Sequence, residues 1–136
     1  MTLTSPISLN IRHNWIKPLL LSEGTRIEID IDLDTYTGLV KCVCPHTGQT
    51  IWEARVPDRI EGTPAASSHC VYIGCFDKKL YAFCIVTGEQ KWFYETGGIV
   101  KSTPLVLRDG LVFGSYDHHV YSLDFKGQVK WKCEVR

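Results

Sequence analysis

A tryptophan-containing motif occurs three times in this 136-residue chain, at intervals of 40 and 39 residues. A glycine precedes each tryptophan by four residues, in the pairs Gly48 and Trp52, Gly88 and Trp92, and Gly127 and Trp131. Other positions keep the same period, with Thr63-Pro64, Gly74 and Asp77 recurring as Thr103-Pro104, Gly114 and Asp117. A repeat of this length is typical of stacked supersecondary units, each burying its apolar face against the next.

The second copy of the repeat shows the pattern of one unit most clearly. Short apolar runs at 70–76, 79–85, 90–94 and 100–107 are separated by turn residues at 77–78, 87–89 and 108–110. Gly88 and Gly110 suit these turns because glycine tolerates the positive φ that tight hairpins need. Four short strands with a turn about every ten residues indicate an all-β unit.

The third copy repeats this plan, and the first copy is altered. Strands are expected at 111–116, 119–125 and 129–135 in the third copy, and at 39–44 and 50–55 in the first. Residues 26–33 alternate in polarity, which predicts a half-buried strand. We expect one face of it to be buried and the other, acidic face to meet solvent; the acidic residues are Glu28, Asp30, Asp32 and Asp34.

A four-stranded unit of about forty residues is a β-propeller blade, and such blades close rings of typically 4–8. The predicted fold class is therefore all-β, a partial β-propeller of about three four-stranded antiparallel blades. Residues 15–136 form the repeats, with blades at about 15–55, 62–96 and 102–136, and residues 1–14 stay unassigned. Strand-and-helix repeats are excluded because no segment has a helical period.

Composition limits the classes of binding partner and the cellular compartment that we expect for this chain. Fifteen basic and fifteen acidic residues balance, so the chain lacks the positive field that attracts nucleic acid or an anionic membrane. The apolar run at 15–21 is interrupted by Lys17 and Pro18, and it lacks the build of a secretory signal. Six cysteines without such a signal are expected to stay reduced. We therefore expect a cytoplasmic location.

The segment 80–92, with Tyr81-Ala82, Thr87-Gly88 and Trp92, resembles the tryptophan-docking blade of the PQQ-type (pyrroloquinoline quinone-like) repeat family. The likeness covers about residues 37–136 and implies that each tryptophan packs against the following blade. Segments 58–61, 71–75, 100–102 and 114–118 look more narrowly like the carboxy-terminal propeller of the aminoadipate-semialdehyde-dehydrogenase-like, β-alanine-activating enzymes of the acyl-CoA synthetase family. That likeness implies a parent with an ATP-dependent adenylating domain, a phosphopantetheine carrier and this propeller.

The PQQ-type resemblance raises the hypothesis of a quinone site. In that family the quinone lies on the propeller axis beside calcium, a catalytic aspartate and a disulfide between adjacent cysteines. This chain has no adjacent cysteine pair, and three blades cannot enclose an axis. Asp77 and Asp117 are interpreted as turn residues that bond their own backbone. No catalytic, cofactor-binding or metal-binding residue is predicted, and the ten repeat positions are read as structural: Gly48, Trp52, Gly74, Asp77, Gly88, Trp92, Gly114, Asp117, Gly127 and Trp131.

The cysteine and histidine pairs are interpreted as structural residues and not as metal ligands. Cys42 and Cys44 share one face of a strand, but a zinc site needs two further ligands, so buried packing is favoured. Cys84 falls in register with Cys44 and shares that reading. His118 and His119 are adjacent, which points them to opposite faces of a hairpin.

These observations favour a non-catalytic interaction or scaffold segment, a fragment or isoform of an adenylating β-alanine-activating enzyme. The alternative is a fragment of a quinone-dependent dehydrogenase. A sensor or assembly propeller of the secretory or envelope type is disfavoured because no signal segment is recognised. The expected partners are another protein or the missing blades, with self-association through open blade faces because unpaired edges and faces promote it.

Overall fold

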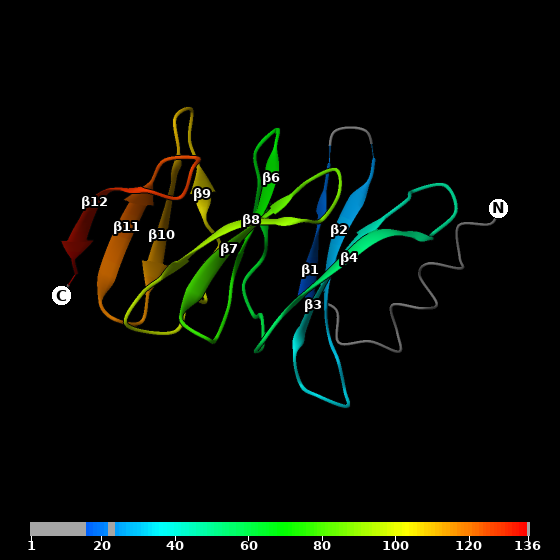
Figure 1. Ribbon diagram of the computed structural model, residues 1–136, viewed down its shortest axis with the longest axis horizontal. Helices are drawn as coiled ribbons and strands as arrows, with labels where there is room; N and C mark the ends of the chain where they lie inside the picture. The colour runs from blue at the N-terminus through cyan, green and yellow to red at the C-terminus, as the bar shows by residue number, and fades with distance from the viewer. Residues whose placement is uncertain (1–15, 22–23, 136) are drawn as a thin grey trace.

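The computed structural model describes residues 16–21 and 24–135, which form three four-stranded antiparallel sheets (Figure 1). The first sheet contains β1 (Ile16–Leu20), β2 (Arg26–Ile31), β3 (Gly38–Val43) and β4 (Thr50–Val56). The second contains β5 (Ala65–Ala66), β6 (Cys70–Gly74), β7 (Lys79–Cys84) and β8 (Gln90–Glu95). The third contains β9 (Leu105–Val106), β10 (Leu111–Ser115), β11 (His119–Leu123) and β12 (Val129–Glu134). The predicted all-β fold of three blades is confirmed.

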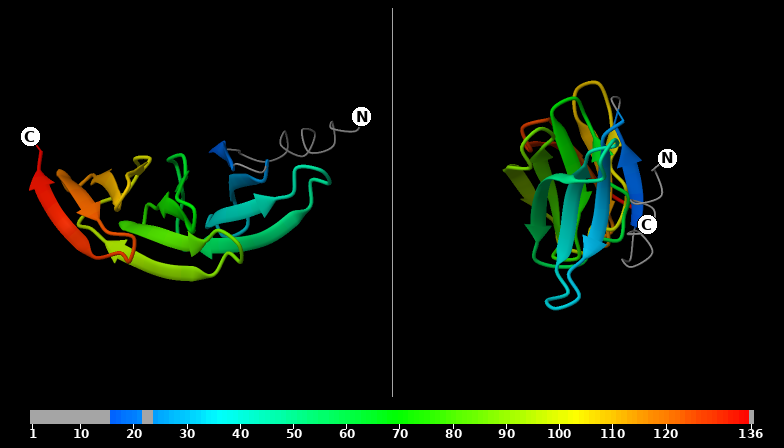
Figure 2. Two further views of the ribbon diagram at one scale, coloured as in Figure 1. Left: turned by 90° about the horizontal axis from the view of Figure 1, so that it is seen from above. Right: turned by 90° about the vertical axis from the view of Figure 1, so that its right-hand side faces the viewer.

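Each sheet pairs its strands in the order in which they occur along the chain. The three sheets stand side by side on an arc, with β4, β8 and β12 along the convex side and the first strand of each sheet toward the concave side (Figure 2). This arrangement is part of a propeller ring, in which each sheet is one blade.

Apolar side chains fill the two spaces between neighbouring sheets. One cluster joins the first and second sheets, with Ile27, Ile29, Val40 and Phe83 among its members. The other joins the second and third sheets around Tyr72, Leu80, Phe113 and Tyr121. Because each sheet has apolar residues facing its neighbour, the blades stabilise one another.

The strand predicted at 100–107 is wrong in extent. Only β9, at Leu105 and Val106, is strand, and it pairs with β10 of the third sheet. Val100 is fully buried within the link between the blades, where its main-chain oxygen would lie 2.7 Å from a Cβ placed on Gly74. The apolar run therefore marked a buried connection, which strand periodicity does not distinguish from a strand.

The prediction that the acidic face of β2 meets solvent is also wrong. Glu28 and Asp30 are only 4% exposed, so both faces of this strand are covered. The Arg26 guanidinium donates to the Glu28 carboxylate at 2.7 Å, and the Ile31 backbone N–H donates to Asp30 Oδ1 at 2.7 Å. Burial raises the pKa of Glu28 against the opposing effect of Arg26. Leu33 follows the end of the strand and is exposed, contrary to its expected place on the buried face.

Candidate functional site

The first tryptophan of the repeat anchors the first blade to the second. Trp52 on β4 is 8% exposed, and its indole Nε1–H donates to the main-chain oxygen of Ile85 at 3.0 Å. Gly88 lies against the indole ring with φ at +79°, and a Cβ there would come within 2.5 Å of Trp52 Cε3. Glycine is needed at this position both for its backbone angle and for the close approach.

The second tryptophan repeats this contact between the second and third blades. Trp92 Nε1–H donates to the main-chain oxygen of Phe125 at 3.0 Å. A Cβ on Gly127, where φ is +86°, would lie 2.5 Å from Trp92 Cδ2. Two successive blades are thus joined by an indole, a backbone acceptor and a glycine.

A β-bulge recurs beside each tryptophan. The register shifts at Ile51 on β4, at Lys91 on β8 and at Lys130 on β12, so that each of these residues has no partner opposite it. A bulge bends a strand and redirects its side chains. Its recurrence next to Trp52, Trp92 and Trp131 puts the three tryptophans in equivalent positions on their strands.

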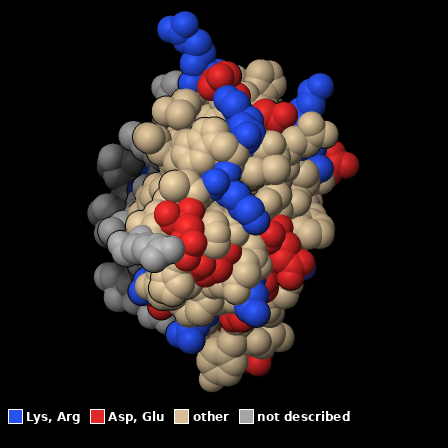
Figure 3. All heavy atoms as spheres, turned by 90° about the vertical axis from the view of Figure 1, so that its left-hand side faces the viewer, with Lys and Arg blue, Asp and Glu red and all other residues tan. Residues whose placement is uncertain are grey.

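Trp131 has the position of a docking tryptophan but no docked turn among the described residues. It is 49% exposed, and Val129 at the start of β12 and Val135 just after its end are exposed to a similar degree. This face, which we call the terminal face, consists of the outward side of the third sheet around Trp131, Cys133 and Val135. Figure 3 looks onto this end of the molecule, where uncharged residues cover much of the surface between scattered charges of both signs.

A shallow groove of about 400 Å³ lies on the terminal face. Val120 stands directly opposite Cys133 in the pairing of β11 with β12, which puts the groove on the same side of the sheet as Trp131. Its walls are formed by Ser102, Gly114, Ser115, Tyr116, His118, His119, Val120 and Val135. An exposed apolar strip with an adjoining groove is the kind of surface that marks an interaction site.

Asp77 and Asp117 hold equivalent hairpin turns. Asp77 Oδ1 accepts from Lys79 N–H at 3.1 Å, and Asp117 Oδ1 accepts from His119 N–H at 3.0 Å. Their second carboxylate oxygens accept from the hydroxyls of Tyr81 and Tyr121. Both tyrosine pKa values are raised, first by burial and then by these carboxylates.

Asp117 also links the second and third blades. Its Oδ2 accepts from the Gly97 backbone N–H at 2.9 Å. Burial opposes ionisation of this carboxyl, but the hydrogen bonds from Tyr121, Gly97 and His119 outweigh it and lower its pKa. Gly114, which holds in the third blade the repeat position of Gly74, donates its N–H to Ser102 Oγ at 3.0 Å.

Cys44, which directly follows β3, and Cys84, the last residue of β7, are half-buried, which corrects their interpretation as buried packing residues. In the third blade the equivalent position is Asp124, whose Oδ1 accepts from the Lys126 and Gln128 backbone N–H groups, both at 2.9 Å. Hydrogen bonds lower the pKa of both thiols. At Cys44 they come from the His46 backbone and from Thr47, and at Cys84 from the Thr87 side chain and backbone. Cys42 is buried as expected.

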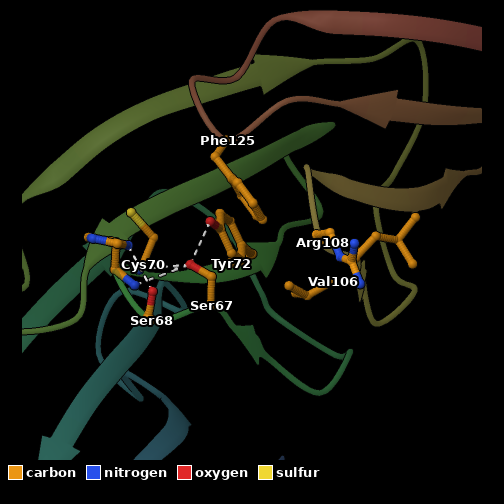
Figure 4. Close-up of a pocket in the computed structure, with 9 residues that line it drawn as sticks. Ser67, Ser68, Cys70, Tyr72, Val106, Arg108 and Phe125 are labelled. Carbon is orange, nitrogen blue, oxygen red and sulfur yellow. Dashed lines mark hydrogen bonds between the residues drawn. The ribbon is translucent and has the colours of Figure 1, made fainter.

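A pocket of about 560 Å³ lies between the second and third sheets (Figure 4). Its polar side holds a Ser67 Oγ to Tyr72 hydroxyl contact of 3.0 Å and a Ser68 Oγ to His69 Nδ1 contact of 2.9 Å. Val106 and Phe125 supply apolar walls from the third blade. Burial raises the pKa of the Tyr72 hydroxyl. The pocket belongs to the seam between two blades, and sequence periodicity contained no signal for it.

In 16–21 and 24–135, no three His, Cys, Asp or Glu residues are grouped so as to hold a metal ion. Within the same ranges, no helix is long and apolar enough to cross a membrane. His118 lies in a turn at φ +69°, and His119 begins β11, as expected for two adjacent hairpin residues.

Two curated proteins are similar to this chain in sequence. The β-alanine-activating enzyme of Drosophila melanogaster is 30% identical over 111 residues, which is 77% of this chain and 11% of that enzyme. The quinoprotein ethanol dehydrogenase of Pseudomonas putida is 31% identical over 74 residues, which is 53% of this chain and 12% of that protein. The chain therefore spans only a small part of the length of these relatives.

Solved structures share the fold at lower identity. BamB from Moraxella catarrhalis superposes with a TM-score of 0.71 at 18% identity, over 85% of this chain and 36% of that one. Quinohemoprotein alcohol dehydrogenase from Comamonas testosteroni gives a TM-score of 0.68 at 19% identity, over 88% and 20% of the two chains. The family described as outer membrane protein assembly factor BamB matches residues 36–136, more than half of the chain. With its docked tryptophans and four-stranded blades, the chain belongs to this PQQ-type β-propeller repeat family.

Proposed function

We propose that the chain is a non-catalytic propeller segment whose terminal face binds a further blade. The observation that carries the proposal is the contrast among the three tryptophans. Trp52 and Trp92 each dock on a following turn, whereas Trp131 is half exposed in the same setting. A turn carrying a glycine and a free main-chain oxygen, as at Gly88 and Ile85, is the complementary partner for Trp131.

The proposed parent is an adenylating enzyme of the β-alanine-activating type in the acyl-CoA synthetase family, located in the cytoplasm. The 30% identity to the Drosophila enzyme, over 77% of this chain, supports this parent. The propeller then acts as an interaction module beside the adenylating part. Its own partner is another protein or the remaining blades.

A second candidate parent is a quinone-dependent dehydrogenase. The 31% identity to the Pseudomonas putida quinoprotein favours it, over a shorter stretch of 74 residues. The chain lacks an adjacent cysteine pair, which the resemblance to such enzymes implies at their quinone. For this reason the dehydrogenase is kept as the alternative.

The docking proposal is tested by supplying the missing blade. A second copy of residues 97–136 is appended to the chain, with phenylalanine in place of its own tryptophan so that it adds no indole. We expect acrylamide quenching of Trp131 to fall and its emission to shift to the blue, because the appended glycine turn covers the ring. The Trp131→Phe form of each chain isolates this signal. Unchanged quenching of Trp131 in a folded extended chain contradicts the proposal.

The parent is tested separately. Sequencing of transcripts across both ends of the coding region distinguishes an adjoining adenylating domain from an adjoining dehydrogenase with adjacent cysteines. Fluorescence titration of the chain with pyrroloquinoline quinone and Ca²⁺ supplies a second test. If the parent is of the β-alanine-activating type, we expect no saturable quenching of the chain's tryptophan fluorescence. Saturable quenching favours the dehydrogenase parent.

A further inference from the structure

Cys70 on β6 and Cys84 on β7 stand directly opposite each other. Their backbone N–H groups point away from each other, because Cys70 donates to Ser67 Oγ at 3.2 Å and Cys84 donates to Glu89 O at 2.7 Å. The next pair along the strands is hydrogen-bonded, with Ile85 N–H donating to His69 O at 2.9 Å. The two cysteines therefore occupy a non-hydrogen-bonded pair, in which opposing side chains approach most closely.

This position suits a disulfide of limited stability. Residues in a non-hydrogen-bonded pair have Cα atoms about 4.5 Å apart, and disulfides span Cα separations of about 4.4–6.8 Å. A bond between Cys70 and Cys84 falls at the short end of this range. Disulfides that are strained or exposed are the more easily reduced and labile ones, and Cys84 is partly exposed.

The two thiols have different surroundings. Cys84 is half-buried, and hydrogen bonds from the Thr87 side chain and from the turn backbone lower its pKa. Cys70 is buried, lines the pocket between the second and third sheets (Figure 4), and has its pKa raised first by burial and then by the neighbouring Cys84. An accessible thiolate beside a buried thiol can react with an oxidant first and be resolved by its neighbour second.

We propose that Cys70 and Cys84 form a reversible cross-strand disulfide whose oxidant is a low-molecular-weight disulfide. The Cys84 thiolate attacks one sulfur of the small disulfide, which makes a mixed disulfide and releases one small thiolate. Cys70 loses its proton and attacks Cys84 Sγ, which breaks the mixed disulfide and releases the second small thiol. Overall two protein thiols are oxidised to one disulfide, and one small disulfide is reduced to two thiols.

Within the described residues, the second blade alone carries this pair. The pairing of Arg26 with Val43 puts Thr25 opposite Cys44, and the pairing of Leu111 with Leu123 puts Gly110 opposite Asp124. Cys44 is therefore a matched control: a half-buried thiol with a lowered pKa and a threonine in place of the second cysteine.

The bond would also act on the seam between blades. Ile85, which directly follows Cys84, provides the main-chain oxygen that accepts the Trp52 indole N–H. A disulfide at Cys84 fastens this acceptor turn to β6. We therefore expect oxidation to strengthen the attachment of the first blade to the second.

The proposal is tested by incubating the reduced chain with oxidised and reduced glutathione, trapping free thiols with N-ethylmaleimide, and mapping tryptic peptides without reduction. We expect Cys70 and Cys84 to be lost as free thiols and a linked pair of peptides, 60–78 with 80–91, to appear. Because peptide 60–78 also contains Cys75, the Cys75→Ser variant is included to assign the bond to Cys70. Dithiothreitol should restore both thiols.

The variants separate the two steps. Cys70→Ser should stop the reaction at a glutathione adduct on Cys84, and Cys84→Ser should abolish the linked peptides. Cys44→Ser should leave them unchanged, and in the native chain Cys44 should stop at the adduct. Circular dichroism checks that each variant is folded. The proposal is overturned if Cys84 in the folded native chain retains glutathione while Cys70 remains alkylatable, or if Cys84 links equally to Cys44 or Cys133.

Discussion

At the scale of single residues, the seam between blades depends on a few close contacts. Each docked indole donates one hydrogen bond to a backbone oxygen and covers one glycine of the next blade. The glycine has no substitute, because it combines a positive φ with a ring at 2.5 Å from the place of its Cβ. Burial then decides how much each tryptophan contributes.

Replacement of the three tryptophans by alanine should give graded losses of stability. Trp52→Ala should cost about 3–5 kcal/mol, as expected for a buried large aromatic, and Trp92→Ala somewhat less because its ring is half-buried. Trp131→Ala should cost less than about 1 kcal/mol, since half its surface is exposed. Urea unfolding followed by circular dichroism measures the series. Equal losses at the three positions would show that Trp131 is docked.

Gly88→Ala should be more destabilising than Gly24→Ala by about 1–3 kcal/mol. Both glycines have positive φ, +79° and +92°, so both variants carry a similar backbone cost of about 1–2 kcal/mol. At Gly24 the nearest atom to an added Cβ is Pro45 Cγ at 3.5 Å, an ordinary contact, whereas at Gly88 the Trp52 ring must move. Thermal unfolding of the two variants side by side checks the difference.

At the scale of elements, side-chain hydrogen bonds hold the turns between strands and the link between the second and third blades. The turn before each tryptophan strand is capped by Cys44, Cys84 or Asp124. The link between the second and third blades is held by Asp117, which bonds Gly97. A thiol and a carboxylate can take the same cap position because both accept backbone N–H groups, the carboxylate more strongly.

Asp124→Ala should lower the free energy of unfolding by about 1–2 kcal/mol, because two backbone N–H groups lose a charged acceptor. Asp109→Ala is the matched control. Its carboxylate is exposed and bonds the Lys130 ammonium at 2.9 Å, and an exposed ion pair contributes about 0–1 kcal/mol. Urea denaturation of both variants provides the comparison, and equal effects would mean that the cap does not stabilise the turn.

Asp117→Asn should destabilise the chain at neutral pH by about 1–2 kcal/mol and lose this effect in acid. The folded-state pKa of Asp117 lies below its ordinary value, which is about 3.9 in an unfolded chain. Its ionised form therefore contributes stability above the unfolded pKa, and this contribution is lost as pH falls through the folded pKa. Urea unfolding of both proteins between pH 3 and 7 tests this. A constant difference across that range would assign the effect to something other than ionisation.

At the scale of the whole molecule, three blades on an arc leave the terminal face uncovered. Exposed apolar surface of this kind favours association. The same surface is the proposed docking site for a further blade. Stability and assembly are therefore coupled in this chain.

The isolated chain should self-associate, with a melting temperature that rises with protein concentration, because association stabilises the folded state. Trp131→Glu should weaken association by putting a charge on the terminal face. Leu33→Glu is the control, since Leu33 is 62% exposed in the loop after β2, away from that face. Sedimentation velocity over a wide range of concentration measures both. A monomer at every concentration would refute the prediction.

Periodicity in the sequence was sufficient for the number of blades and for most strands. Thr87-Gly88 and Trp92 lie where the repeat put them, because turn and core positions impose particular residue types. Alternation failed at Glu28 and Asp30, since it reports polarity and not which faces are covered. The groove, the pocket and the backbone acceptors at Ile85 and Phe125 left no side-chain pattern to detect.

By itself the sequence determined the repeat, the all-β class and the positions of the docking tryptophans, because these depend on local residue types at a fixed period. Tertiary structure alone decided which tryptophan is docked and which cysteines face each other. Trp52 and Trp131 have the same local pattern, but among the described residues a following turn covers the ring of Trp52 alone of the two. Cys70 and Cys84 are 14 residues apart and meet only through strand register, which long-range pairing sets.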